Sequence, residues 1–457
     1  MNTLINISGA SGVGKTTIST MISLILSNLN SSVLSICGDD LHKWERGNEN
    51  WTKYTHFNPE ANNLSLGEDH IATLLAGSTI NRDHYDHTSG KFIKDVLIKP
   101  ESVIINEGLH SLYSEAICEM AELNIFVETE NDLKNQWKLN RDMEKRGYTR
   151  DQVISSIGLR KIDEAKYILP QKRNANVVVK FSEMKDKSVQ LTYTAATKYG
   201  QLLMQRIKAF YELHRNFLLT CRKSCFEYEL IQGAGGNLSY KFEDKIVITS
   251  SGRSMPDISI LNGFTMCNDD GTKVNSSQDR PSMELGFHTK LASRVVYHTH
   301  PIYANIILCS NEAKMVMADI LHSFDYDYIE YITPGMELCN KLASKKDIVL
   351  LENHGLICCS ESFEEAFSMS LQINQLCKEW LIKNSKTFKT FGNKVTSKNS
   401  DRILYPDAAI LPEANLQINN YMLQIQEEVG LTSKYISRQE IEKLKNMEEE
   451  KYRMELI

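Results

Sequence analysis

The sequence lacks the features of a membrane-spanning, secreted or nucleic-acid-binding protein. No apolar run reaches 18 residues, and the first residues lack the basic region and long apolar stretch of a signal peptide. The 52 basic side chains are outnumbered by 58 acidic ones, so a net charge of −6 leaves no basic excess to attract nucleic acid or an anionic membrane. We therefore expect a cytoplasmic protein with neither a nucleic-acid nor a membrane partner.

Disulfide and repeat signals are also missing. The ten cysteines are scattered and include no CxxC pair, so we expect reduced thiols, several of them buried. There is no 20–50-residue repeat and no low-complexity tract. What remains is a chain of 457 residues, 42% hydrophobic and 24% charged, which is typical of globular domains. At roughly 150 residues per domain, this length predicts about two or three of them.

Short apolar segments alternate with helical stretches in the first part of the chain, which predicts parallel βαβ units. The expected strands are 4–8, 32–37, 103–106, 123–128, 176–181 and 189–194. After a predicted helix at about 195–225 the pattern changes to short strands and turns, closed by a helix at 364–382. A charged helix at 438–454 is typical of a solvated terminus or an oligomer contact. The predicted parts are residues 1–200, residues 201–385, and a linker with a helical tail at 386–457.

A glycine-rich loop lies between the first strand and a helix expected at about 16–27. Residues 9–16 read GASGVGKT and match GxxxxGK[ST], a pattern whose backbone N–H groups surround phosphate oxygens. Lys15 would reach the β- and γ-phosphates, and Thr16 would place its hydroxyl on Mg²⁺. The alternative is a glycine turn without a ligand. The predicted ATP and magnesium site comprises Gly9, Ser11, Gly12, Gly14, Lys15, Thr16, Thr17 and Glu107.

Acidic and basic side chains follow the neighbouring strands. Asp39 comes directly after the second strand, where a carboxylate can accept a proton from an attacking hydroxyl, although a turn or helix-cap role is the alternative. Glu107 ends the third strand, where an acidic residue would orient Mg²⁺. Four cations at near-helical spacing could clamp a transferring phosphoryl group or form a solvated face. They are Lys138, Arg141, Lys145 and Arg146.

These residues resemble the phosphoribulokinase/uridine kinase family, closer to its bacterial phosphoribulokinase branch. The motifs are GASGVGKTT at 9–17, GDDLHK at 38–43, HFNPEAN at 56–62, YDH at 85–87, NEGLH at 106–110 and KLNRDMEKRGYT at 138–149. The resemblance implies a Mg-ATP kinase with Asp39 as catalytic base, Lys15 on the phosphates and Glu107 at the metal. Arg141 and Arg146 would hold phosphates. The implied acceptor side comprises His56, Glu60, Asn62, Tyr85 and His87.

One departure from the family pattern leaves the acceptor open. Asp40-Leu41 stands where the family has Ser or Ala followed by Phe. A sugar, a sugar phosphate or a nucleoside therefore remains possible as the acceptor.

The second part of the chain contains three histidines with metal-ligand spacing. His298 and His300 lie two residues apart at the end of an apolar strand, so their side chains face the same side. His354 follows another apolar strand. Three neutral imidazoles with one open position are typical of catalytic Zn²⁺ or a similar divalent metal. Glu284 could transfer a proton beside the metal, or could be an ordinary first-turn glutamate.

Two polar turns at 235–239 and 249–252 could hold a phosphate, or could be ordinary hairpin turns. With the histidines they resemble the class II aldolase/adducin family, of the fuculose-1-phosphate aldolase type. The motifs are GAGGNLS at 233–239, TSSG at 249–252, PSMELGFH at 281–288, HTHP at 298–301 and ENHGL at 352–356. The resemblance implies Zn²⁺ on His298, His300 and His354, with Glu284 as acid/base and a candidate fourth ligand. It implies a substrate-phosphate site at Asn237, Ser251, Gly252 and Ser282.

The two resemblances imply an α/β fold for each part. The first would be a P-loop kinase domain with a mainly parallel sheet, and the second an aldolase-like domain with a central, mainly antiparallel sheet. The leading hypothesis is a bifunctional enzyme that phosphorylates a sugar-like metabolite and cleaves or forms a C–C bond in a phosphorylated ketose. The alternatives are a nucleoside kinase fused to a decarboxylase, dehydratase or epimerase, and a regulatory protein with one inactive half. By family analogy we also expect a homo-oligomer, such as a tetramer.

Overall fold

The computed structural model describes residues 2–226, 229–274, 279–392 and 402–456. The chain divides into two compact units, Met1–Glu212 and Leu213–Ile457, and the division falls inside helix α6 (Lys198–Phe226). The structure thus differs from the predicted boundary at 200/201. Within the described residues, no helix is both long enough and apolar enough to cross a membrane.

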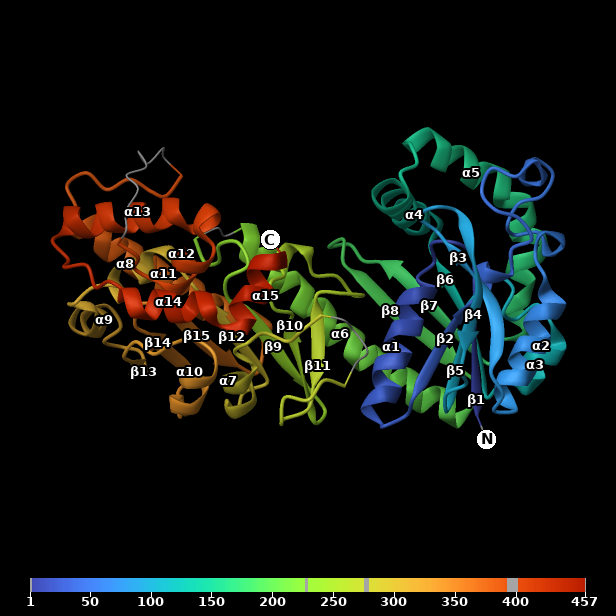
Figure 1. Cartoon of the computed structure of the whole chain (residues 1–457), viewed down its shortest axis with the longest axis horizontal. Helices are drawn as coiled ribbons and strands as arrows, with labels where there is room; N and C mark the ends of the chain where they lie inside the picture. Colours follow the sequence, from blue (N-terminus) through green and yellow to red (C-terminus); the bar gives the residue numbers. More distant parts are fainter. Residues whose placement is uncertain (1, 227–228, 275–278, 393–401, 457) are drawn as a thin grey trace. The chain divides into compact units, whose positions relative to one another are not determined.

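Unit 1 contains a six-stranded sheet in which five parallel strands carry one antiparallel strand at an edge (Figure 1). Its order is β2 (Val33–Cys37), β5 (Val103–Gly108), β1 (Thr3–Ser8), β6 (Leu123–Thr129), β7 (Val177–Glu183) and β8 (Val189–Ala195). The prediction of a mainly parallel sheet is confirmed. The helices that precede α6 are α1 (Lys15–Asn28), α2 (Leu64–Leu75), α3 (Glu115–Met120), α4 (Asn131–Arg146) and α5 (Arg150–Asp163).

A separate hairpin, β3 (Ile80–Asp86) and β4 (Lys91–Ile98), was not expected from the sequence. Its strands are interrupted by charged residues, and the pairing shifts register between Arg82 and His84. The irregular alternation explains why the strand pattern is weak in the sequence.

Unit 2 contains a seven-stranded sheet that is antiparallel except for one parallel pair at an edge, as predicted. Its order is β11 (Phe264–Cys267), β10 (Lys245–Thr249), β9 (Asn237–Phe242), β12 (Val295–Thr299), β15 (Gly355–Ser360), β14 (Ile348–Leu351) and β13 (Tyr326–Ile329). The earlier helices are α7 (Leu285–Lys290), α8 (Ile302–Leu308), α9 (Ala313–Ile320), α10 (Met336–Lys341) and α11 (Phe363–Asn384). The C-terminal helices are α12 (Pro406–Ile410), α13 (Pro412–Val429), α14 (Arg438–Asn446) and α15 (Glu448–Leu456).

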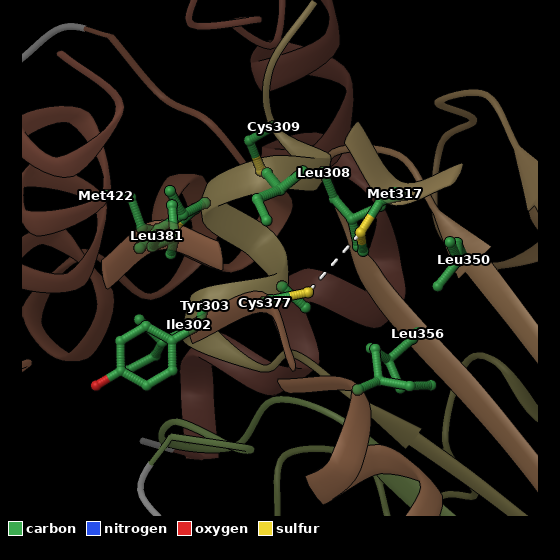
Figure 2. Close-up of a cluster of buried hydrophobic side chains, with 14 of the residues drawn as sticks. Ile302, Tyr303, Leu308, Cys309, Met317, Leu350, Leu356, Cys377, Leu381 and Met422 are labelled. Carbon is green, nitrogen blue, oxygen red and sulfur yellow. Dashed lines mark hydrogen bonds between the residues drawn. The ribbon is translucent and has the colours of Figure 1, made fainter. Parts of the chain in front are cut away.

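The C-terminal segment is part of unit 2 and not a separate tail. Met422 of α13 lies in the same buried cluster as residues of α8, β15 and α11 (Figure 2). The same cluster includes Leu404 and Tyr405, which are almost fully buried. Burial of this apolar surface holds the segment against the unit. The prediction of a separate linker and tail at 386–457 is therefore wrong for the described residues, which belong to unit 2. Residues 393–401 of the predicted linker lie outside the described residues.

Candidate active sites

The glycine loop of unit 1 has positive φ values at three of its glycines. Gly9, Gly12 and Gly14 have φ values of 148°, 88° and 93°, which side chains other than hydrogen rarely allow. Helix α1 begins immediately after them, so its N-terminus adds a positive dipole to the loop. The Lys15 ammonium lies over the loop and donates to the carbonyls of Gly9 and Ala10, both at 3.0 Å.

The two predicted magnesium-site residues are in direct contact. The Thr16 hydroxyl donates to Glu107 Oε1 at 2.6 Å, which joins the start of α1 to β5. Thr17 lies in the same first turn, and the Ser11 hydroxyl accepts from Arg141 at 3.2 Å. Two oxygen-bearing side chains beside a phosphate loop suit Mg²⁺, which prefers oxygen ligands and keeps several waters.

Asp39 is held as an ionised carboxylate. It lies in a short 3₁₀ turn after β2, with His87 Nε2 3.1 Å from its Oδ2 and His42 Nε2 3.6 Å from its Oδ1. Burial opposes ionisation, but the His87 hydrogen bond and the charges of His42 and Lys15 outweigh it and hold the pKa of Asp39 well below its usual value. Asp39 is thus ionised at neutral pH.

Three of the predicted acceptor residues, His56, Asn62 and Tyr85, contact His42, which the sequence analysis did not single out, whereas Glu60 is exposed. The His42 ring lies 4.6 Å from that of His56 and 5.4 Å from that of Tyr85, measured between centroids. The Tyr85 ring also contacts His87, at 5.2 Å. Burial lowers the pKa of His56 to about 2, so its ring stays neutral. The position of His42, three residues after the predicted base, is the signal that could have identified it.

Asp40, the departure from the family pattern, attaches the hairpin to the turn that contains Asp39. Its carboxylate lies 3.3 Å from Arg82 Nε and 3.2 Å from His84 Nδ1, and it accepts the backbone N–H of Tyr85 at 2.9 Å. All these partners are on β3. Asp40 therefore places the hairpin that carries Tyr85 and His87.

We expect Asp40→Asn to destabilise unit 1 by about 1–3 kcal/mol, because buried Arg82 would lose its charged partner. The same change should raise the KM for the acceptor, since the hairpin would be less firmly placed. Urea unfolding followed in the wild type, in Asp40→Asn and in the double variant Asp40→Asn/Arg82→Met checks this. A double variant no more stable than Asp40→Asn would contradict the ion-pair explanation.

The predicted basic stripe is organised around an aspartate. Lys138, Arg141 and Arg146 lie within 2.5, 2.9 and 3.5 Å of Asp142, whereas Lys145 is exposed. Three of the four predicted cations thus share a buried carboxylate, and the fourth faces solvent. Burial lowers the pKa of Lys138 to about 8. Arg141, which also contacts Ser11 of the loop, is the cation of this group joined to the phosphate site.

The three predicted histidines of unit 2 converge. His298 is on β12, His300 follows the same strand, and His354 lies in the turn between β14 and β15. His298 Nε2 lies 3.0 Å from His300 Nε2 and 3.3 Å from His354 Nε2. All three side chains are buried, and each offers one nitrogen within 4.8 Å of the others. Three imidazoles with this convergence fit a divalent metal such as Zn²⁺.

The hydrogen bonds behind two of the rings fix where their lone pairs point. His298 Nδ1 lies 3.0 Å from the Leu356 carbonyl, and His300 Nδ1 lies 2.7 Å from Asp407 Oδ2. These oxygens only accept, so both Nδ1 atoms carry protons. The Nε2 atoms of these two rings face each other at 3.0 Å, so a cation between them would be coordinated by both. Burial also lowers the pKa of His354 to about 3, which keeps its ring neutral.

Glu284 lies at the same point. Its Oε2 is 3.5 Å from His298 Nε2 and its Oε1 is 3.5 Å from His354 Nε2. Asn237, at the start of β9, donates to Oε2 at 2.7 Å and to Ser282 Oγ at 3.2 Å. Oε1 is buried without a hydrogen-bond partner among the described residues. A buried carboxylate oxygen without a hydrogen-bond partner, beside three imidazoles, fits a metal site.

Glu284 is also expected to limit the stability of the metal-free protein at high pH. Burial raises the pKa of Glu284 from 4.5 to about 7. Ionising this carboxyl in the folded protein therefore costs roughly 3 kcal/mol more than in the unfolded chain. Unfolding lets the group ionise at its ordinary pKa, so this cost is absent below about pH 4.5, grows up to pH 7 and then stays constant. Glu284→Gln should therefore melt at a higher temperature at pH 8, and the gain should shrink towards pH 5. Calorimetry with chelator present checks this; equal melting at pH 8 would contradict it.

A pocket of about 450 Å³ of empty space, open mouth included, adjoins the histidines. The turn at 249–252 lines it, and the hydroxyls of Ser250 and Ser251 are buried without a partner among the described residues. Ser282 and Asn237 line it too, so the predicted phosphate-binding residues are brought together, with Gly252 beside them. Four further lining residues come from the C-terminal segment and were missed: Pro406, Asp407, Glu450 and Arg453.

Comparison with known proteins matches each unit separately. The model of the phosphoribulokinase/uridine kinase family matches residues 4–188, and that of the class II aldolase and adducin N-terminal domain matches residues 216–381. Phosphoribulokinase of a Synechocystis species is 35% identical over 176 residues, which are 38% of this chain and 52% of that protein. The chain thus spans about half the length of that relative. Uridine kinase of Borreliella burgdorferi is 30% identical over 201 residues, 42% of this chain and 94% of that protein.

The solved class II aldolase domain of a conserved Thermoplasma acidophilum protein covers 36% of this chain and 92% of its own, at 22% identity and a TM-score of 0.33. The family assignment itself comes from the sequence matches. Residues 4–188 belong to the phosphoribulokinase/uridine kinase family, and residues 216–381 match the model of the class II aldolase and adducin N-terminal domain.

Proposed function

We propose that the chain is a bifunctional enzyme. Unit 1 transfers the γ-phosphoryl group of Mg-ATP to a hydroxyl of a sugar or sugar-like metabolite, and unit 2 uses a divalent metal, Zn²⁺ by preference, to cleave or form a C–C bond in a phosphorylated ketose. The observation that supports this proposal is that each unit brings reactive side chains together: ionised Asp39 near the glycine loop, and Glu284 beside three convergent imidazoles.

In the kinase reaction, Asp39 accepts the proton of the attacking hydroxyl. A bond forms between that oxygen and the γ-phosphorus while the bond from the γ-phosphorus to the leaving oxygen of ADP breaks. Lys15 and Arg141 supply positive charge to the phosphoryl oxygens, and Thr16 and Glu107 orient Mg²⁺. His56, Tyr85 and His87 hold the acceptor.

In the second reaction, His298, His300 and His354 would hold the metal, which would supply Lewis-acid chemistry at the substrate carbonyl. Glu284 moves the proton, since its carboxylate lies 3.5 Å from both His298 Nε2 and His354 Nε2, beside the point where the metal would be held. The substrate phosphate is held by Asn237, Ser251, Gly252 and Ser282. Because the kinase supplies a phosphate and the pocket of unit 2 is suited to one, the two reactions are proposed to be consecutive.

The test is a panel assay on the purified full chain. Ketoses, sugar phosphates, uridine and cytidine are incubated with Mg-ATP, and phosphorylated ketoses with Zn²⁺; products are identified by mass spectrometry. Phosphorylation of nucleosides alone would select the nucleoside-kinase alternative, consistent with the uridine kinase relative. If His354→Ala changes the products of no substrate while Lys15→Ala abolishes phosphorylation, unit 2 is catalytically silent.

A further inference from the structure

The C-terminal segment reaches the three-histidine centre from outside the residues that match the aldolase family. The family match ends at residue 381, whereas Asp407 lies on α12 and Arg453 on α15. Resting on the metal site proposed above, we infer that Asp407 is a positioning residue that fixes the His300 imidazole for metal binding, and that Arg453 holds Asp407 in place.

The contact between Asp407 and His300 is short and enclosed. Asp407 Oδ2 lies 2.7 Å from His300 Nδ1, and the two side chains are 4% and 5% exposed. A carboxylate that accepts from Nδ1–H leaves Nε2 with its lone pair, directed at His298 Nε2 3.0 Å away. Without Asp407 the ring could rotate or adopt the other tautomer, and the ligand set would lose its geometry.

The backbone around this contact is shaped to admit it. A Cβ on Gly235 would lie 2.4 Å from Asp407 Oδ2 and 2.9 Å from His300 Nδ1, so a side chain at 235 would collide with both partners. Asn353, next to ligand residue His354, donates at 2.7 Å to the carbonyls of Leu404 and Lys434. The C-terminal segment is thus hydrogen-bonded to the loop that carries the third histidine.

Arg453 satisfies the other oxygen of Asp407. Its Nη2 donates to Asp407 Oδ1 at 3.1 Å and to the Ala234 carbonyl at 3.3 Å. Its Nη1 donates to both carboxylate oxygens of Glu450, at 3.1 and 2.9 Å. The guanidinium therefore connects α15 to α12 and to the turn that contains Gly235.

Zinc affinity of the full chain tests the inference. After metal is stripped with a chelator, Zn²⁺ binding is measured by competition with a chromophoric chelator. Asp407→Asn should weaken binding about 10–100-fold. Arg453→Gln should weaken it less, in the same direction, and serves if Asp407→Asn fails to fold. Asp279→Asn is the matched control, because this aspartate also pairs with an arginine in unit 2, at 3.0 Å, but contacts no metal-site histidine; its affinity should be unchanged.

A second readout separates positioning from general stability. Co²⁺ substituted at the site should give a d–d absorption band that shifts in Asp407→Asn and not in Asp279→Asn. Wild-type affinity and spectrum in both Asp407→Asn and Arg453→Gln, with binding lost in His298→Ala, would overturn the inference and leave the metal site intact. Zinc binding that is absent in the wild type, or unaffected by His298→Ala, would instead overturn the proposed metal site itself.

Discussion

Replacing Asp39 with asparagine is expected to slow phosphoryl transfer by about 10²–10⁴-fold, the usual contribution of a general base. Asparagine keeps the size of the side chain and the contact with His87 but cannot accept the proton. ATP binding, which depends on the loop and Lys15, should remain. Steady-state kinetics with the acceptor found in the panel assay, together with ATP titration by calorimetry, measure the two effects separately.

The control for this prediction is Asp69→Asn, an exposed aspartate on α2 of the same unit. It should leave the rate unchanged. A wild-type rate in Asp39→Asn would contradict the role of Asp39 as base. A loss of ATP binding in that variant would instead place Asp39 in the nucleotide site.

Replacing His298 with alanine is expected to weaken Zn²⁺ binding by about 100-fold or more and to abolish carbonyl chemistry in unit 2. Loss of a residue that only orients a metal ligand weakens metal binding by about 10–100-fold. His298 is itself a proposed ligand and lies against both other imidazoles, so its loss should weaken binding at least as much. Wild-type protein should gain thermal stability on zinc addition, about 2.7 kcal/mol at a hundred times Kd, and His298→Ala should gain much less. Chelator competition and calorimetry check both effects.

His322→Ala provides the matched control for this second prediction. His322 is exposed in unit 2 and its Nδ1 lies against the Asp319 carbonyl, away from the centre. Its zinc affinity should equal that of the wild type. Equal zinc affinity in His298→Ala would contradict the three-histidine site.

Local motifs were sufficient to predict many of the residues that lie together at the two candidate sites. The loop around Lys15 and the histidines at 298 and 300 can be recognised from spacings of a few residues. Strand or helix geometry then fixes where their side chains point. Even His354, far along the chain, was found because a turn after an apolar strand carries it. The two sheet types followed from the order of apolar segments and from the resemblances.

Residues that act through long-range contacts could not be predicted in the same way. Asp407 lies 107 positions from His300, and nothing in the sequence around it specifies that contact. The charged stretch at 438–454 was expected to be one solvated or oligomer-contacting helix, but it forms two helices, and Glu450 and Arg453 are enclosed as an ion pair. A charged residue is a reliable sign of an exposed position only where it has no oppositely charged partner, because paired charges can be buried together.

The consecutive action of the two units is the central claim, and one measurement tests it most directly. Wild type and Glu284→Gln are incubated side by side with Mg-ATP, Zn²⁺ and the preferred acceptor, and products are followed by mass spectrometry. We predict that a phosphorylated ketose accumulates only in Glu284→Gln, while the wild type converts it to a triose phosphate. Persistence of the same phosphorylated product in both proteins would contradict consecutive action.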